Sequence, residues 1–152
     1  MEKLLKNLAE MTAAEIIKEI RAFAWANHMA VKNLECPQFV RDIYFLNILD
    51  FWLNEEGDVL RGYYDVVPHM ITALHSISAH HDATLLQKIY DIYTPEQDER
   101  SFDGTWRPEK MWNPIHELYD KMQFYDDVGD YMWALAEKYV ECEKLKTQPT
   151  SA

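Results

Sequence analysis

Residues 37–54 restrict the fold more than any other part of the chain. After Pro37, apolar side chains recur on every side of a helix axis: Phe39, Val40, Ile43, Tyr44, Phe45, Leu46, Ile48, Leu49, Phe51, Trp52 and Leu53. A helix that is apolar all round must be surrounded by other elements. Residues 43–49 could alternatively form a buried strand, but an apolar segment this long between Pro37 and Gly57 favours a helix. We therefore expect a central hydrophobic helix over about residues 37–54.

Helix signals dominate the rest of the chain as well. Thr12 and Glu15 have the spacing of a capping box, and Asp82 and the Asp126-Asp127 pair precede apolar periodic segments that they are expected to cap. Proline, glycine and charged residues predict a long loop over residues 95–111. The expected helices cover residues 2–10, 12–30, 37–54, 58–64, 83–93, 113–124 and 128–145, with another beginning at Pro68.

These patterns predict an all-α fold, a single-domain bundle of six to eight helices around the central hydrophobic helix. A chain of 152 residues suits one domain with one core. We expect this helical domain over residues 1–146 and a disordered tail over residues 147–152. No apolar run is long enough for a membrane-spanning helix.

The charge of the chain is strongly acidic and unevenly distributed. Its formal net charge is −11, and residues 91–143 alone carry 14 acidic and 5 basic side chains. Such a field repels nucleic acids and anionic membranes and attracts basic partners. The carboxylates expected to bind a basic protein partner are Asp98, Glu99, Asp103, Glu109, Asp120, Asp126, Asp127 and Asp130. Phe102, Trp106 and Trp112 lie in or beside the expected loop, and we expect most of them to anchor it to the body.

Few residue patterns in the chain point to catalysis. With 4 glycines, the chain has no glycine-rich phosphate-binding loop, and we expect no cofactor. His69, His75, His80 and His81 could form a metal site with nearby carboxylates, but their spacing does not force the convergence that zinc requires. Neither a catalytic residue nor a metal ligand is therefore assigned. Cys36 lies at the start of a helix and Cys142 on an expected core face, so the two cysteines predict no disulfide and suit a cytoplasmic protein.

One stretch of the sequence matches a known pattern. Its elements are Asn54 with residues 61–64 (Arg-Gly-Tyr-Tyr), residues 73–79 (Ala-Leu-His-Ser-Ile-Ser-Ala) and Leu85-Leu86. This stretch resembles a segment of a family of small acidic bacterial all-helical proteins that includes a DNA mimic. The family has a double glycine that is not intact here, and Ser78 stands where the family has glycine. The resemblance implies a helical homodimer whose acidic face occupies a DNA-binding protein, and it assigns no contact residue.

We therefore expect a non-catalytic cytoplasmic protein that binds and occludes a basic partner, a DNA-binding protein or a nuclease toxin, in the manner of a DNA mimic. Direct contact with nucleic acid or membrane is not expected. An immunity protein that neutralises a toxin, or a phage-encoded inhibitor of a defence system, would have the same sequence features. A metal-dependent hydrolase that uses the four histidines is the alternative from another class. A homodimer in which acidity serves only solubility is a third interpretation.

Overall fold

The computed structural model describes residues 4, 6–26, 36–101 and 109–147, and these residues form one all-helical domain. In chain order the elements are η1 (Leu8–Glu10), α2 (Ala13–Ala26), α3 (Gln38–Glu55), α4 (Leu60–Tyr63), η3 (Tyr64–Val66), α5 (Val67–Ser76), α6 (His80–Ile92), α7 (Pro95–Ser101), α8 (Glu109–Asp120), η4 (Gln123–Asp126) and α9 (Asp130–Thr147). The expected all-α bundle is therefore confirmed. None of the helices in the described ranges is long and apolar enough to cross a membrane.

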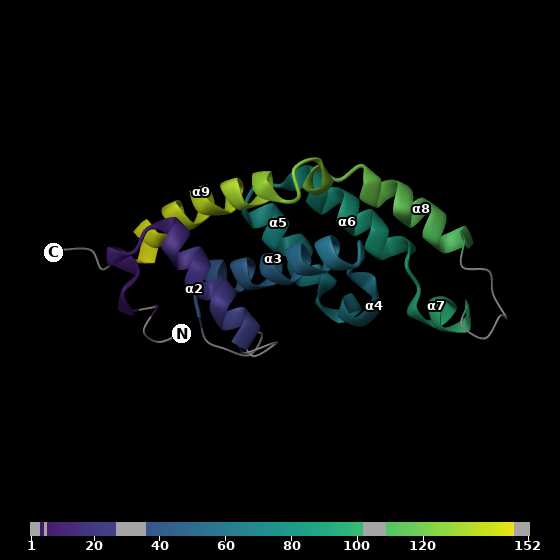
Figure 1. Cartoon of the computed structure of the whole chain (residues 1–152), viewed down its shortest axis with the longest axis horizontal. Coiled ribbons are helices and arrows are strands. Elements are labelled where there is room, and N and C mark those ends of the chain that lie inside the picture. Colours follow the sequence, from purple (N-terminus) through teal and green to yellow (C-terminus); the bar gives the residue numbers. More distant parts are fainter. Residues whose placement is uncertain (1–3, 5, 27–35, 102–108, 148–152) are drawn as a thin grey trace.

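Helix α3 lies at the centre of the domain, as its apolar pattern predicts. It runs along the long axis in Figure 1 and contacts α5, α2 and α9. Almost every side chain from Phe39 to Leu49 is buried. Two polar side chains are buried with them and are hydrogen bonded: Asn47 accepts from Arg21, and Asp42 accepts from Gln38 and Tyr139. A helix surrounded on all sides must satisfy its polar groups in this way.

Two of the predicted caps form as expected. The Glu15 amide donates to the Thr12 hydroxyl at 3.1 Å, and Glu15 accepts from the Thr12 amide at 3.2 Å. At the other end of the chain, Asp127 accepts from the Tyr131 amide at 2.9 Å and so caps α9. Each cap satisfies amides that have no partner within the first turn of a helix. The prediction that the first of these helices extends to Ala30 lies partly outside the described residues, since α2 is described only to Ala26.

The prediction for Asp82 was wrong. Helix α6 begins at His80, three residues before the predicted start at residue 83, and its N-cap residue makes no side-chain capping hydrogen bond. The buried Asp82 carboxylate instead accepts from the amides of Gln123 and Phe124, at 2.7 and 3.0 Å. Its role is therefore long-range: it ties η4 to α6. Cys142 also differs from expectation, because it is exposed and not part of the core.

The prediction of a long loop over residues 95–111 was also wrong for the part that the structure describes. Residues 95–101 form α7, and α8 begins at Glu109, so Pro114 lies inside α8 and does not open it. Residues 102–108 of the expected loop, which contain Phe102, Asp103 and Trp106, lie outside the described residues. The expected tail over 147–152 lies outside them too, except that Thr147 is the last residue of α9.

Left-handed residues determine where two other helices end or begin. Ser78, with φ of 68°, lies in the turn between α5 and α6, where the Ala79 amide donates to the Leu74 carbonyl. Val128 and Gly129, with φ of 56° and 90°, precede α9. Because consecutive left-handed residues cannot belong to a right-handed helix, α9 begins at Asp130 and not at Val128 as predicted.

Candidate partner-binding site

The eight carboxylates expected to bind a partner have three different environments. Glu99, Glu109, Asp120, Asp126 and Asp130 are exposed, on α7, α8, η4 and the start of α9. Asp127 is half-buried and caps α9, and Asp98 is buried. Asp103 lies outside the described residues. Within the described part of the chain, the ion pairs join Arg21 to Asp50, Arg61 to Asp98, and neighbours within α9, so Glu109, Asp120, Asp126 and Asp130 have no cationic partner there.

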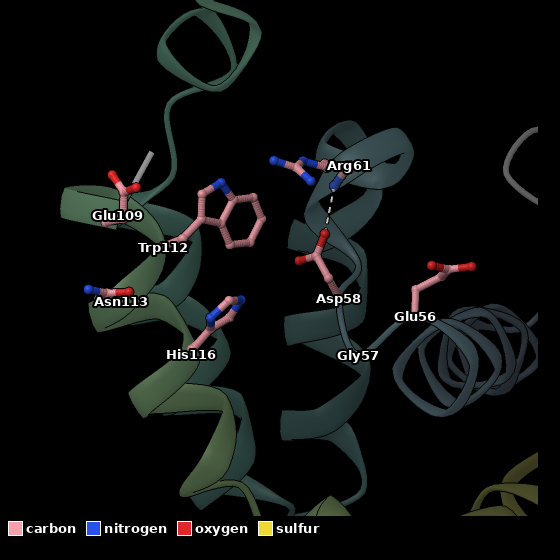
Figure 2. Close-up of a pocket in the computed structure, with 8 residues that line it drawn as sticks. All are labelled: Glu56, Gly57, Asp58, Arg61, Glu109, Trp112, Asn113 and His116. Atoms are coloured by element: carbon pink, nitrogen blue, oxygen red, sulfur yellow. Dashed lines mark hydrogen bonds between the residues drawn. The ribbon is translucent and has the colours of Figure 1, made fainter. Parts of the chain in front are cut away.

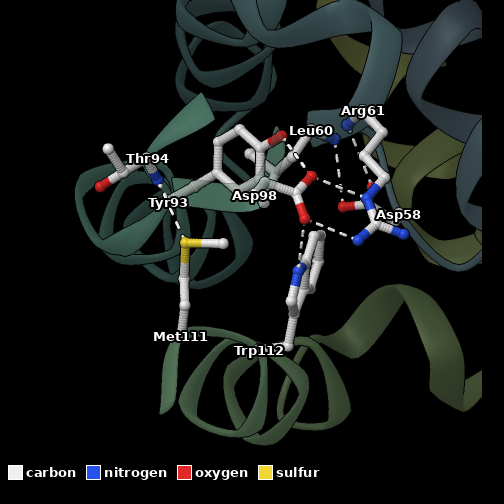
Figure 3. A network of polar contacts seen from close by, with 8 residues as sticks. All are labelled: Asp58, Leu60, Arg61, Tyr93, Thr94, Asp98, Met111 and Trp112. Atoms are coloured by element: carbon white, nitrogen blue, oxygen red, sulfur yellow. Dashed lines mark hydrogen bonds and ion pairs between the residues drawn. The ribbon is translucent and has the colours of Figure 1, made fainter. Parts of the chain in front are cut away.

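Asp98 departs from the expectation that it lies on an outer acidic surface, because it is only 3 % exposed. Arg61 donates to both of its oxygens, at 2.7 and 2.6 Å, and Tyr93 and Trp112 donate to one oxygen each (Figure 3). The Arg61 hydrogen bonds, together with those from Trp112 and Tyr93, lower the pKa of Asp98 to about 2. Asp98 is therefore a structural group that joins α7, α4 and α8.

A second polar contact fastens α8 to the turn between α3 and α4. The Tyr119 hydroxyl donates to Asp58 at 2.8 Å and accepts from the Val59 amide at 3.3 Å. Burial and the neighbouring Asp58 charge raise the pKa of Tyr119 well above its ordinary value. Asp58 also accepts from the amides of Leu60 and Arg61, and this arrangement holds the first turn of α4.

Between these two contacts lies a cleft of about 390 Å³, with α8 as one wall and residues 56–61, the α3–α4 turn and the start of α4, as the other. From one wall, Trp112 and His116 project toward Asp58 and Arg61 on the other (Figure 2). The Arg61 guanidinium lies over the Trp112 ring, 4.6 Å from its centroid. The complete lining is Glu56, Gly57, Asp58, Arg61, Glu109, Trp112, Asn113 and His116.

Residues 123–130, which we call the η4 loop, form a firmly held surface next to this cleft. The Asp82 carboxylate accepts hydrogen bonds from the loop amides of Gln123 and Phe124. Phe124 is buried, and the Gly129 amide donates to the Phe124 carbonyl at 2.8 Å. The loop displays two apolar side chains, Val128 at 64 % and Tyr125 at 37 % exposure. Among the described residues the only other large apolar side chain this exposed is Leu145, near the end of α9.

Tyr125 connects the η4 loop to the cleft. Its hydroxyl lies 3.5 Å from the carbonyl of Gly57, which lines the cleft. Burial and the charges of Asp58 and Asp120 raise the pKa of Tyr125 to about 12, which places those two carboxylates around the same ring. At the other end of the loop, Asp130 adds to the burial that raises the pKa of Asp50.

Six carboxylates line the cleft, end α8 or lie in the η4 loop, and we call them together the acidic face: Glu56, Asp58, Glu109, Asp120, Asp126 and Asp130. Four of them were predicted as partner-binding residues. Glu56 and Asp58 were missed, because no spacing relates them to α8, which lies more than fifty positions later in the chain. The contacts of Tyr119 with Asp58 and Val59, and of Arg61 with Trp112, bring the two segments together.

The four histidines proposed as metal ligands do not converge. His75 and His80 face each other with their Nδ1 atoms 2.8 Å apart, whereas His69 stacks on Phe45 and the ring of His81 contacts the Lys121 carbonyl. Within the described ranges, no three histidine, cysteine or acidic side chains are arranged to hold a metal ion. The arrangement required by the hydrolase interpretation is therefore not assembled by these residues.

Comparisons with protein-family models, with curated proteins and with solved structures gave no match to this chain, so its function is inferred from its own residues.

Proposed function

We propose that the protein is a non-catalytic, cytoplasmic inhibitor that binds a basic protein through the acidic face and thereby blocks a nucleic-acid-binding or nuclease surface. The observation that supports this proposal is that Glu109, Asp120, Asp126 and Asp130 are exposed along α8 and the η4 loop and have no cationic partner in the described chain. A surface with an excess of unpaired carboxylates accelerates encounter with a positively charged partner.

The η4 loop adds exposed apolar side chains to the acidic surface. Charged residues at the rim of an interface mainly steer association, whereas affinity comes from a few apolar or aromatic anchors at its centre. We assign this role to Tyr125 and Val128, which are exposed in the η4 loop together with Asp126 and Asp130. Because Asp82 and the buried Phe124 already hold the loop in place, the loop loses little conformational entropy when a partner binds it.

The proposed mechanism is competition for the partner's basic surface. Exposed carboxylates and nucleic-acid phosphates carry the same sign of charge, and both accept hydrogen bonds from arginine and lysine. A basic groove that accepts phosphates can therefore accept these carboxylates instead. A DNA-binding protein and a nuclease toxin would both be blocked in this way, and identification of the natural partner distinguishes a DNA mimic from an immunity protein. Self-association through the acidic face is disfavoured, because it would bring like charges together.

Charge reversal at two exposed positions tests the proposal. Asp120 ends α8 and Asp126 lies in η4, and neither side chain makes a hydrogen bond in the described structure, so D120K/D126K leaves the caps intact. We expect it to weaken binding of a short oligoarginine peptide by about tenfold or more, a loss typical of removing a few charged contacts. Asp127 is left unchanged because it caps α9.

The matched control is E10K/E19K, which changes the net charge equally at exposed positions on η1 and α2. It should leave peptide binding within about threefold of wild type, because distant surface charges are largely screened. Equal losses in both variants would contradict the proposal, since binding would then depend on net charge and not on the acidic face. Thermal unfolding of both variants checks that each is folded.

A further inference from the structure

Two histidines meet at the turn between α5 and α6. His75 lies in the last turn of α5, and His80 is the first residue of α6. Their Nδ1 atoms are 2.8 Å apart, and their ring centres are 5.0 Å apart. The second distance is close to the first plus the two ring radii, so both nitrogens lie nearly on the line that joins the rings. This is the geometry of an N–H···N hydrogen bond and not of two ligands directed at one metal ion.

Only one of the two rings can be the donor in this hydrogen bond. A neutral imidazole has one N–H and one acceptor nitrogen, whereas a protonated imidazole donates from both nitrogens. The pair can therefore stay hydrogen bonded with no added proton or with one, but not when both rings are charged. The helix ends decide the direction, because a cation is favoured at the carbonyl end of α5 and disfavoured at the amide end of α6. His75 is accordingly the donor, and His80 is the acceptor.

The turn that this pair spans contains a strained residue. Ser78 has a φ of 68°, in the left-handed region that is unfavourable for a residue with a Cβ. The amides of Ser78 and Ala79 donate to the carbonyls of His75 and Leu74, at 3.0 and 2.8 Å. The contact between His75 and His80 joins the two ends of the same turn. It therefore supports a backbone conformation that persists only when the surrounding structure holds it.

Other charged and titratable groups near the turn belong to the elements packed around it: His81 and Asp82 of α6, Lys121 after α8, Tyr131 and Tyr139 of α9, and Asp42 of α3. The Nε2 atom of His81 lies 3.1 Å from the Lys121 carbonyl, which can only accept, so His81 keeps this contact when its other nitrogen is protonated. Carboxylates ordinarily titrate near about pH 4, and phenols and lysines near about pH 10, whereas imidazoles titrate at about pH 6.5. Mild acid therefore acts on the His75–His80 contact and leaves the other contacts in place.

We propose that the His75–His80 pair is a pH-sensitive switch that holds the α5–α6 turn closed near neutral pH and releases it in mild acid. With at most one added proton the two rings stay hydrogen bonded, and with a second proton they repel each other. Release separates the start of α6 from the end of α5, while His81 and Asp82 continue to hold α6 to the segment before the η4 loop and to the loop itself. This inference goes beyond the proposed function and does not depend on it.

The hydrogen positions on the two rings test the hydrogen bond directly. NMR spectra that correlate ring nitrogens with ring hydrogens are recorded on the full chain at about pH 7.5 and about pH 5, on either side of the ordinary titration of imidazole. At the higher pH we expect a hydrogen on Nδ1 of His75 and none on Nδ1 of His80. At the lower pH we expect hydrogens on both nitrogens of both rings. Absence of a hydrogen from both Nδ1 atoms at the higher pH would overturn the inference, because no hydrogen bond could then join the rings.

Hydrogen exchange of the Ala79 amide tests the release of the turn. After correction for the intrinsic effect of pH, we expect its protection to fall by about three- to tenfold from about pH 7.5 to about pH 5, the range for loss of one hydrogen bond, while the Leu46 amide in α3 does not change.

His80→Gln removes the acceptor ring, so its Ala79 protection should already be low at the higher pH and should not change with pH. His69→Gln is the matched control, because His69 is exposed on α5 but stacks on Phe45, and it should keep the wild-type response. Protection in the wild type that does not depend on pH, or the same pH response in His80→Gln as in the wild type, would overturn the inference.

Discussion

Ser78 is a single residue whose backbone conformation limits stability. Its φ of 68° lies in the left-handed region, which costs a residue with a Cβ about 1–2 kcal/mol relative to its right-handed conformation. Glycine does not have this cost. We expect Ser78→Gly to raise the free energy of unfolding by about 0.5–1 kcal/mol, less than the full strain because glycine also gains entropy when unfolded. Urea unfolding measures the change.

Ser76→Gly is the control for that prediction. Ser76 is the last residue of α5, with a hydroxyl that donates to the Thr72 carbonyl, and it gains nothing from glycine's left-handed freedom. The same replacement there should lower the free energy of unfolding by several tenths of a kcal/mol, roughly the helix-propensity difference. Loss of stability at residue 78 as well would show that its turn is not strained.

Gly129 combines a left-handed backbone with close packing. A Cβ there would lie 2.6 Å from a Phe124 ring carbon and 3.1 Å from Asp50 Oδ1. Since Phe124 is buried and cannot move away freely, we expect Gly129→Ala to cost at least about 2 kcal/mol of unfolding free energy. It should also weaken oligoarginine binding, because the η4 loop is displaced.

Gly57→Ala isolates the backbone contribution. Gly57 has a similar φ of 67°, and a Cβ there meets no atom within 4 Å. We expect only the left-handed cost of about 1 kcal/mol at this position. Chemical denaturation of the two variants side by side gives the comparison, and equal losses would mean that Phe124 does not enclose Gly129.

At the scale of elements, α7 depends on one carboxylate. The pKa of Asp98 is about 2 in the folded protein, below its ordinary value of 3.8. A lowered pKa means that the stabilisation is fully present above the ordinary value and is lost as the pH falls through the folded one. The contribution is about 2 kcal/mol near neutral pH, and it should disappear between about pH 4 and pH 2.

Asp98→Asn tests this link between α7, α4 and α8. At neutral pH we expect a loss of about 2 kcal/mol and faster hydrogen exchange in α7, because Arg61 and Trp112 lose their charged partner. Near pH 2 the variant and the wild type should have nearly equal unfolding free energies. Glu99→Gln, at the exposed neighbouring position, should change neither quantity. A stability difference that does not depend on pH would contradict the role given to Asp98.

The elements also show what the sequence could and could not reveal. Helix α3 and the Thr12–Glu15 capping box depend on neighbouring residues, so local pattern predicted them. Helix α7 was missed because Pro95 and dense charge are typical of loops, while its stabilising contact is with Arg61, 37 residues earlier. The role of Asp82 was wrong for the same reason, since its partners lie more than 40 residues away.

The candidate site was predictable to a similar extent. The excess of acid in the last third of the chain indicated four members of the acidic face. Local pattern could not show that Asp98 is buried, because that depends on Arg61, Tyr93 and Trp112 together. Nor could it indicate the cleft, which exists only where α8 contacts the α3–α4 turn.

Over the whole molecule, net charge and charge placement have separate effects. A net charge of −11 attracts any cation at long range, but screening limits that attraction to about 10 Å at 0.1 M salt. Carboxylates placed close together in the η4 loop act on a bound cationic peptide within that distance. We therefore expect oligoarginine binding to weaken steeply from about 50 to 200 mM salt and to lose this steepness in D120K/D126K. Titrations at several salt concentrations measure both slopes, and identical slopes would argue against a localised face.

The most direct measurement is the map of amide shifts that the oligoarginine peptide causes across the full chain in NMR spectra. A single acidic face predicts shifts that concentrate on Gly57, on the exposed side of α8 and on the η4 loop from Gln123 to Asp130, with α2 unchanged. Shifts spread evenly over the surface, or centred on α2 and the outer side of α6, would contradict the account.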